Sequence, residues 1–315
     1  MLQPLAVDVG HGYVKALSAR ARVVFPALIG PAPTQVDLAD FAPTEVLRID
    51  GMPYLCGEPA RAHAAPRWSR YKAQDLDTLR LMLVAAARLD LHGPIQLATG
   101  LPLSWYGHQR KAFREALLAY GGTVQLPDRP AHRLWFESVT VLPQGLAAAL
   151  TLLLDPDRQP GTYLVLDHGY RTTEYLIVTK SANGTVDADP TQAGSLELGT
   201  HAIAATVATG LETDYRLPFS AVEVEEADQV YVRGQAVALA ERRAAAAHAV
   251  STQIRDRLTE VLDARIAKVV GVLQCGGGAP VLHRAFPEAL IPEDPQWANV
   301  SAYWGSVADA TAAIS

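Results

Sequence analysis

The sequence predicts an α/β protein built from two domains. Its 315 residues are enough for two hydrophobic cores. Segments rich in β-forming residues alternate with segments of helical periodicity, which is the pattern of an α/β fold. Two hairpins of the same form, each a strand, an Asp-x-Gly turn and a second strand, begin at residues 5 and 163. A repeat spaced by about half the chain indicates two related domains.

Composition and charge exclude several classes of protein. Hydrophobic residues make up 49% of the chain, charged residues 19%, and the net charge is −6. The Lys and Arg residues do not gather in one run, so we expect no direct nucleic-acid binding. We find no apolar run of membrane-spanning length and no secretory leader, and we expect no membrane association. The two cysteines, Cys56 and Cys275, cannot form a disulfide framework and favour a reducing compartment. We therefore expect a cytoplasmic protein.

In the first half, apolar runs at 5–10 and 13–17 flank a glycine-containing turn and predict a hairpin. Helical periodicity over 73–91 places Leu76, Leu79, Leu83 and Ala87 on one side. Next we expect a strand at 95–98 that ends in a loop at 99–103. A helix at 108–120, closed by Gly121 and Gly122, follows. A strand at 139–142 and a helix at 144–154 complete this half. The turn-rich segment 155–161 is the best internal domain boundary.

In the second half, the hairpin of 163–169 and 172–178 is followed by a predicted helix at 200–209. Residues 235–267 are rich in helix formers and predict more than one helix. A buried strand at 269–273 then opens into three consecutive glycines.

The first Asp-x-Gly turn has the residue types of a phosphate site. Gly10 and Gly12 let backbone amides approach an anion closely, and Asp8 can orient waters around a divalent metal. Lys15 on the returning strand can reach a phosphate as a point charge. Taken alone, an ordinary hairpin with an acidic turn explains the same residues equally well.

The second turn makes the ordinary hairpin a weaker explanation. Asp167, Gly169, Thr172 and Thr173 repeat the acidic group and the phosphate donors. Glu174 can add a carboxylate near a metal or can be a surface residue. Gly276, Gly277 and Gly278 follow a strand and permit close approach of a base or ribose. One triglycine turn is weak evidence, but its place after two Asp-x-Gly hairpins predicts a nucleotide site.

These three elements, in this order, resemble the nucleotide site shared by actin, the heat-shock chaperones and the sugar kinases. The segments 99–103 and 167–175 look like the plasmid-segregation branch, the ParM/StbA-type and archaeal ParM-like actins. The Pro-Gln-Gly start at 143–145 looks like the interdomain connector of that group, and 297–305 resembles its closing helix. The resemblance spans most of the chain.

The resemblance implies two ribonuclease-H-like, actin-like domains around a nucleotide cleft. The first would span 1–158, with an inserted subdomain at about 20–95, and would be completed by a C-terminal helix at about 296–315. The second would span 159–295. The protein would bind ATP/ADP with Mg²⁺, hydrolyse ATP, and assemble with copies of itself into filaments, with plasmid or DNA segregation as its cytoskeletal role. A DNA-bound adaptor protein would be a possible partner.

The resemblance also assigns roles to individual residues. Asp8 and Asp167 would organise the hydrated Mg²⁺, and the two turns with Lys15 would hold the phosphates. Gln144 falls where the family has a residue that positions the attacking water, which for a Gln means orientation and not general-base chemistry. The alternative for Gln144 is a solvent-exposed residue at a helix start. His11 stands where the family often has a small hydroxyl or amide residue; its imidazole can donate to a phosphate or be a simple turn residue.

Two other functions fit the same scaffold. A small-molecule kinase would need a carboxylate near the terminal phosphate, and no acceptor-site motif stands out in the sequence. A nucleotide switch that recruits partners without polymerising is the second alternative.

Overall fold

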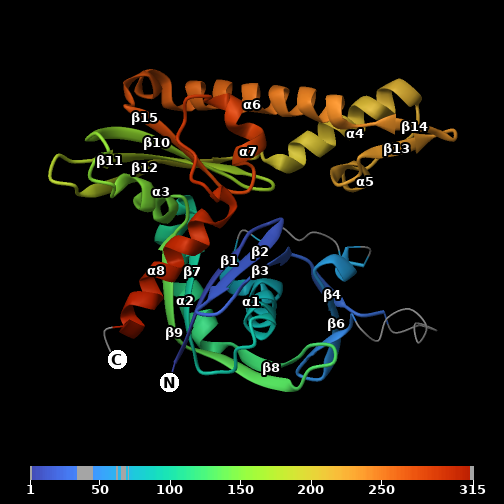
Figure 1. Cartoon of the computed structure of the whole chain (residues 1–315), viewed down its shortest axis with the longest axis vertical. Helices are drawn as coiled ribbons and strands as arrows, with labels where there is room; N and C mark the ends of the chain where they lie inside the picture. Colours follow the sequence, from blue (N-terminus) through green and yellow to red (C-terminus); the bar gives the residue numbers. More distant parts are fainter. Residues whose placement is uncertain (1, 34–44, 62, 65–68, 70, 313–315) are drawn as a thin grey trace. The chain divides into compact units, whose positions relative to one another are not determined.

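The computed structural model describes residues 2–33, 45–61, 63–64, 69 and 71–312. It divides into two compact units, Met1–Ala148 with Trp297–Ser315, and Ala149–Gln296 (Figure 1). The division falls at residues 148–149, before the segment 155–161 on which the predicted limits of 158 and 159 rest. Within the described residues, no helix has both the length and the apolar character needed to cross a membrane.

Unit 1 is built on a nine-stranded sheet with the order β3-β2-β1-β7-β9-β8-β5-β6-β4. Its strands are β1 (Gln3–Val9), β2 (Tyr13–Ser18), β3 (Arg22–Pro26), β4 (Ile29–Pro31), β5 (Leu47–Ile49), β6 (Met52–Cys56), β7 (Ile95–Leu101), β8 (Gly121–Gln125) and β9 (Ala131–Pro143). Its helices are α1 (Leu76–Arg88), α2 (Leu103–Ala119), the start of α3 (Leu146–Leu153) and α8 (Ala298–Ala312). The strands of the predicted subdomain at 20–95 join this same sheet at its two ends: β3 pairs with β2, and β5 with β8.

The two faces of β1 carry different cores. Successive side chains of a strand point to opposite faces, so Leu5, Val7 and Val9 pack in the cluster that holds the buried side of α1. Ala6 lies on the other face, with Val300 and Tyr303 of α8. Figure 1 shows α8 running beside β1 and β7, which it contacts. By the same alternation, Asp8 belongs to the face of Ala6.

Unit 2 is built on a four-stranded sheet with the order β12-β11-β10-β15 and a separate two-stranded hairpin. Its strands are β10 (Gly161–His168), β11 (Thr173–Lys180), β12 (Val186–Leu196), β13 (Gln229–Val232), β14 (Gln235–Ala238) and β15 (Gly271–Cys275). Its helices are α4 (Thr200–Tyr215), α5 (Ala221–Glu225), α6 (Ala240–Leu262) and α7 (Ala279–Leu282). Leu164 and Leu166 of β10 pack with apolar residues of α4 and α6.

The predicted repeat is present in the strand topology. In unit 1, β1 pairs antiparallel with β2, β2 antiparallel with β3, and β1 parallel with β7. In unit 2, β10 pairs antiparallel with β11, β11 antiparallel with β12, and β10 parallel with β15. Each unit therefore places its Asp-x-Gly turn between the first two strands of the same four-stranded pattern.

Several predicted element limits were wrong. The strand predicted at 95–98 continues to Leu101, because residues 99–101 pair in parallel with β9, and the next helix already begins at Leu103. Gly121 and Gly122 do not close that helix: they begin β8, where Gly121 pairs with Trp135. The glycines alone do not set these limits, because pairing with β9 determines where β7 ends and where β8 begins.

Two helix predictions also need correction. Leu76 is 52% exposed, because it is the first residue of α1 and points away from the core that Leu79, Leu83 and Ala87 enter. Residues 235–267 do not form several α-helices; they give β14, then the single 23-residue helix α6 and a 3₁₀ turn. The C-terminal helix ends at Ala312, and residues 313–315 of its predicted range lie outside the described residues.

Candidate functional site: two Asp-x-Gly half-sites

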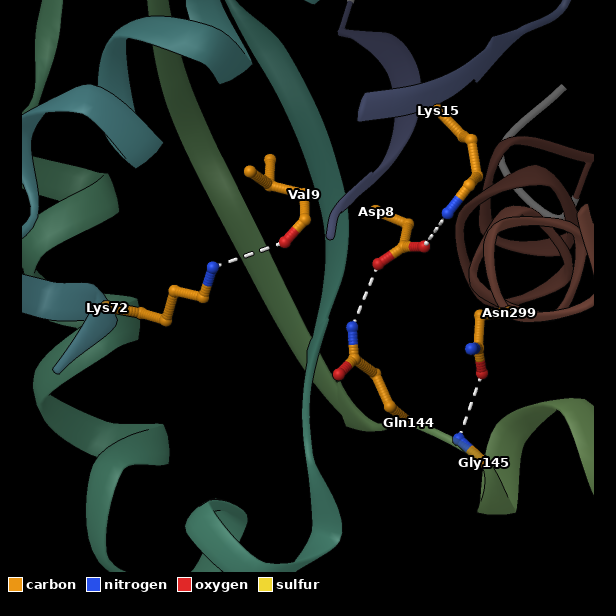
Figure 2. Close-up of polar contacts among 7 residues, drawn as sticks. All are labelled: Asp8, Val9, Lys15, Lys72, Gln144, Gly145 and Asn299. Carbon is orange, nitrogen blue, oxygen red and sulfur yellow. Dashed lines mark hydrogen bonds and ion pairs between the residues drawn. The ribbon is translucent and has the colours of Figure 1, made fainter. Parts of the chain in front are cut away.

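The first half-site gathers three of the predicted residues in unit 1. The hairpin register places Asp8 directly opposite Lys15, and the Lys15 Nζ lies 3.0 Å from Asp8 Oδ2. Gln144 Nε2 donates to the other carboxylate oxygen, Oδ1, at 2.8 Å (Figure 2). Asp8 is only 4% exposed, so the ammonium and the amide offset the cost of burying its charge.

Gln144 precedes α3 and is not part of the helix. It lies in the turn between β9 and α3, where its amide N–H donates to the Leu101 carbonyl at 2.7 Å. The next amide, that of Gly145, donates to Asn299 Oδ1 at 2.9 Å, so α8 helps to hold the turn (Figure 2). The alternative of a solvent-exposed Gln144 was wrong, since its side chain is bonded to Asp8.

Gly100 of β7 is needed for this arrangement. A Cβ at residue 100 would overlap the ring hydroxyl of Tyr303 and lie 3.0 Å from Gln144 Cγ. The glycine predicted in a loop is therefore a sheet residue that lets Tyr303 and Gln144 approach the strand closely.

The two Asp-x-Gly turns close with the same backbone hydrogen bond. Gly10 N–H donates to the Tyr13 carbonyl at 3.1 Å, and Gly169 N–H donates to the Thr172 carbonyl at 2.8 Å. In both turns, an added Cβ on the glycine would lie 3.1 Å from that same carbonyl oxygen. The turns are thus built alike in detail. The Gly12 amide, between β1 and β2, has no hydrogen-bond partner among the described residues and is available to an anion.

In the second half-site, the triglycine turn packs against the Asp-x-Gly turn of the same unit. Gly276 has φ +85°, and its Cβ would overlap Asp167 Oδ1 and the His168 carbonyl. Gly278 N–H donates to the His168 carbonyl at 2.8 Å, and a Cβ there would lie 3.0 Å from it. Two of the three glycines are therefore required by packing within unit 2, beyond the ligand approach that the sequence suggested.

Gly277 differs from its two neighbours. An added Cβ would meet only the Gln296 side chain, at the ordinary contact distance of 3.5 Å. It is the glycine of the three that remains open to a ligand.

Sequence reasoning missed Gly199, the residue before α4. A Cβ there would lie 2.6 Å from the Tyr170 carbonyl oxygen and 2.7 Å from that of Gly169. The amides of Thr200 and His201 donate to these same two carbonyls. The start of α4 thus supports the second turn from behind. A Gly-Thr pair at the start of a predicted helix was the available signal.

His168 is a second residue that the sequence reasoning passed over. It is fully buried; its Nε2 lies 2.9 Å from Gln274 Oε1 and its Nδ1 3.0 Å from Thr173 Oγ1. Gln274 Nε2 donates to the Phe286 carbonyl, so Gln274 Oε1 is the acceptor and His168 Nε2 carries a proton. The imidazole links the Asp-x-Gly turn to the strand that leads into the triglycine turn.

Thr173 takes an internal role that the sequence did not predict. It is fully buried, and its hydroxyl lies 2.7 Å from the Leu198 carbonyl and 3.0 Å from His168 Nδ1, two acceptors within unit 2 for its one proton. Its hydroxyl is therefore committed within unit 2, and we remove Thr173 from the phosphate contacts and keep Thr172. Glu174 accepts a hydrogen bond from the Ser195 hydroxyl at 2.7 Å, on the neighbouring strand β12.

Burial lowers the pKa of His168 to about 4, and the Gln274 hydrogen bond opposes that shift. The unfolded chain protonates His168 near pH 6.5, whereas the folded chain stays neutral down to about pH 4. The contribution of His168 to the free energy of unfolding is therefore greatest above pH 6.5. It is lost as the pH falls from 6.5 to 4, a loss of at most about 3 kcal/mol.

We expect His168→Gln to lose less stability between pH 6.5 and 5.5 than the wild-type chain, by about 1 kcal/mol. Urea denaturation at the two pH values measures this. His248→Gln on α6 gives the control, since it removes an exposed histidine by the same substitution. Equal pH dependence in all three proteins would contradict the assignment of His168 as a buried neutral group.

The donor set fits Mg²⁺ held through water. Each half-site supplies one buried carboxylate, Asp8 or Asp167, and Mg²⁺ is commonly bound by one or two carboxylates, several waters and substrate phosphates. Among the described residues no group of three or more metal-ligating side chains occurs.

Both halves of the chain resemble known actin-like proteins. Residues 6–146 match the family of actin-like proteins, N-terminal domain, and residues 165–288 match the archaeal actin homologue MreB-like family, C-terminal. An archaeal actin homolog of Thermoplasma acidophilum is 24% identical over 95% of this chain and 97% of its own length.

Solved structures of this class share the fold over almost the whole chain. An archaeal actin homolog in complex with ADP has a TM-score of 0.81 at 22% identity, covering 98% of this chain and 100% of that one. The ParM of a 15-stranded filament from Clostridium botulinum has a TM-score of 0.82 at 19% identity, covering 98% and 99%. The fold is therefore that of the two-domain actin-like proteins. Together the two family models cover most of the chain, which is therefore an actin-like protein.

Proposed function

We propose that this chain binds ATP with Mg²⁺ through its Asp-x-Gly turns and hydrolyses it. The observation that carries the proposal is the duplicated turn, in which a buried aspartate is the last residue but one of the inner strand and a glycine amide closes the loop on a carbonyl three residues later. An actin homolog of the same fold has been solved with ADP. A single nucleotide held by both turns would use each of the repeated features.

In this proposal Gly10 and Gly169 close the two phosphate-binding turns with their own amides. The phosphates are held by His11, Gly12 and Lys15 from unit 1 and by Thr172 from unit 2. Asp8 and Asp167 hold the waters of Mg²⁺, which supplies positive charge to the phosphates. Gly277 approaches the adenosine, and Gly276 and Gly278 keep that turn in place. Lys15 exchanges part of its contact with Asp8 for a phosphate oxygen.

In this proposal Gln144 acts in the hydrolysis step. Asp8 holds the side-chain amide of Gln144, and the Leu101 carbonyl holds its backbone amide. The fixed side chain can therefore orient a water for in-line attack on the terminal phosphorus. The bond to the bridging oxygen breaks, and ADP and phosphate leave. Turn amides and Lys15 stabilise the negative charge that develops on the phosphoryl oxygens.

We expect Gln144→Ala to lower the rate of ATP hydrolysis by about 100-fold and to change ATP affinity by only a few-fold, since orientation of water acts in the transition state. Phosphate release and equilibrium ATP binding measure the two effects. Gln159→Ala, in the segment before β10, is the control and should leave both unchanged. A Gln144→Ala protein that hydrolyses ATP at the wild-type rate would remove Gln144 from the mechanism.

We further propose that nucleotide binding drives assembly into filaments, in a cytoplasmic role such as segregation of plasmid or other DNA through an adaptor protein. The support is the family, together with the ParM filament of the same fold. The dispersed basic residues and the net charge of −6 favour an adaptor over direct contact with DNA.

Light scattering after addition of Mg-ATP, followed by electron microscopy of the same sample, tests assembly. We expect filaments with Mg-ATP and their loss as ATP is consumed. ATP turnover that requires an added sugar or acid would favour the kinase alternative. ATP binding without any assembly over a wide protein concentration would favour the non-polymerising switch.

A further inference from the structure

Lys72 is a buried lysine directly behind the first Asp-x-Gly turn. It begins a short 3₁₀ turn, Lys72–Gln74, that leads into α1, and it is 8% exposed. Its Nζ donates to the Val9 carbonyl at 3.2 Å. In Figure 2 the Lys72 side chain extends toward Val9, while Lys15 and Gln144 extend toward the Asp8 carboxylate.

Burying this ammonium is costly, and few groups offset the cost. An ammonium has three N–H donors, and within the described part of the chain that of Lys72 has one acceptor, the Val9 carbonyl. Burial lowers the pKa of Lys72, while the carboxylates of Asp75 and Asp8 act to raise it. A methionine would fill such a site at lower cost. The reason for a charged residue here therefore has to be sought in the group that the ammonium binds, the Val9 carbonyl.

The hydrogen bond acts on the peptide group that enters the turn. The Val9 carbonyl and the Gly10 amide belong to one peptide group; Lys72 holds the carbonyl, and the Tyr13 carbonyl accepts the Gly10 amide at 3.1 Å. Both polar atoms of that planar group are thus fixed. A cavity of about 30 Å³, room for about one water, lies against Gly10, His11 and Lys72. Without the ammonium, this side of the turn would have space to move.

We propose that Lys72 is a positioning residue for phosphate binding: it fixes the Val9–Gly10 peptide so that the turn at 10–12 presents its amides to the nucleotide. The inference rests on the proposed function. Lys72 also adds a second positive charge beside the turn, where Lys15 is already paired with Asp8. Its action on the phosphates is through the turn, not by contact.

Lys180 provides a matched control in unit 2. It is also a buried lysine, 5% exposed, and its Nζ also donates to a backbone carbonyl, that of Asp155, at 2.6 Å. The variants to compare in the full chain are Lys72→Met, Lys72→Gln, Lys72→Arg and Lys180→Met. Equilibrium titration with Mg-ATP and with adenosine gives affinities, and thermal denaturation gives stability.

We expect Lys72→Met to bind Mg-ATP at least about 10-fold more weakly, the effect of losing a charge-assisted hydrogen bond, with adenosine affinity unchanged. Lys72→Arg, which keeps the charge and donors, should recover most of the ATP affinity. Lys180→Met should leave both affinities as in the wild type.

Three outcomes would overturn the inference. Wild-type ATP affinity in Lys72→Met, or an equal loss for ATP and adenosine, would reduce Lys72 to a packing residue. Failure of both Lys72→Met and the milder Lys72→Gln to fold would assign it to the core. If the wild-type chain itself binds no Mg-ATP, the proposed function fails first, which separates the two results.

Discussion

Asp8→Asn is expected to reduce ATP hydrolysis at least 100-fold and to destabilise unit 1 by about 3 kcal/mol. The structural loss follows from the geometry: Asp8 and Lys15 form an ion pair whose side chains are only 5% and 12% exposed. Removing the carboxylate charge leaves the Lys15 ammonium uncompensated in a buried position. The catalytic loss follows because a neutral amide binds the waters of Mg²⁺ poorly.

Phosphate release and chemical denaturation measure the two effects of Asp8→Asn. Glu58→Gln is the control, since it removes an ion pair with Arg61 that is 62% exposed at Glu58. That exposed pair should contribute less than about 1 kcal/mol, and hydrolysis should be unchanged. An Asp8→Asn protein as stable and as active as the control would contradict both assigned roles.

Gly276→Ala is expected to lower the free energy of unfolding by about 3 kcal/mol and to abolish measurable ATP binding. Residue 276 has φ +85°, which an alanine adopts only with strain. Its Cβ would also overlap Asp167 Oδ1 and the His168 carbonyl, so the turn that carries the second aspartate must move. Strain and displacement act on the same half-site.

Gly277→Ala is the matched control for Gly276→Ala. A Cβ at residue 277 meets only the flexible Gln296 side chain at 3.5 Å, and its φ is not in the left-handed region. The fold should keep nearly its full stability, and any loss of ATP affinity then reports on ligand approach. If the two alanine variants were equally stable, the packing of the triglycine turn against Asp167 would be wrong.

Much of the fold follows from local sequence. The hairpin with Asp8 opposite Lys15 is set by two apolar runs around a short glycine turn, and their register brings the two charges together. The equivalent hairpin in unit 2 follows in the same way. The α/β class follows from the hydrophobic patterns of individual segments, and the internal repeat follows from comparing two such segments.

The rest depends on contacts between distant segments. Lys72 meets Val9 across 63 residues, and His168 meets Gln274 across 106. Nothing local in the sequence around Lys72 or His168 marks either residue as buried. The position of Gln144 beside Asp8, across 136 residues, was expected only from the family resemblance. Residue periodicity reports which face of an element is apolar, but not which polar group from elsewhere will be placed on it.

A structure of the chain with Mg²⁺ and a non-hydrolysable ATP analogue tests the central claim most directly. The account predicts one nucleotide whose phosphates contact the turn at 10–12 and the turn at 169–172, with Asp8 and Asp167 on the metal's waters and Gly277 near the adenosine. A nucleotide held by only one of the two turns, or bound away from both aspartates, would contradict it.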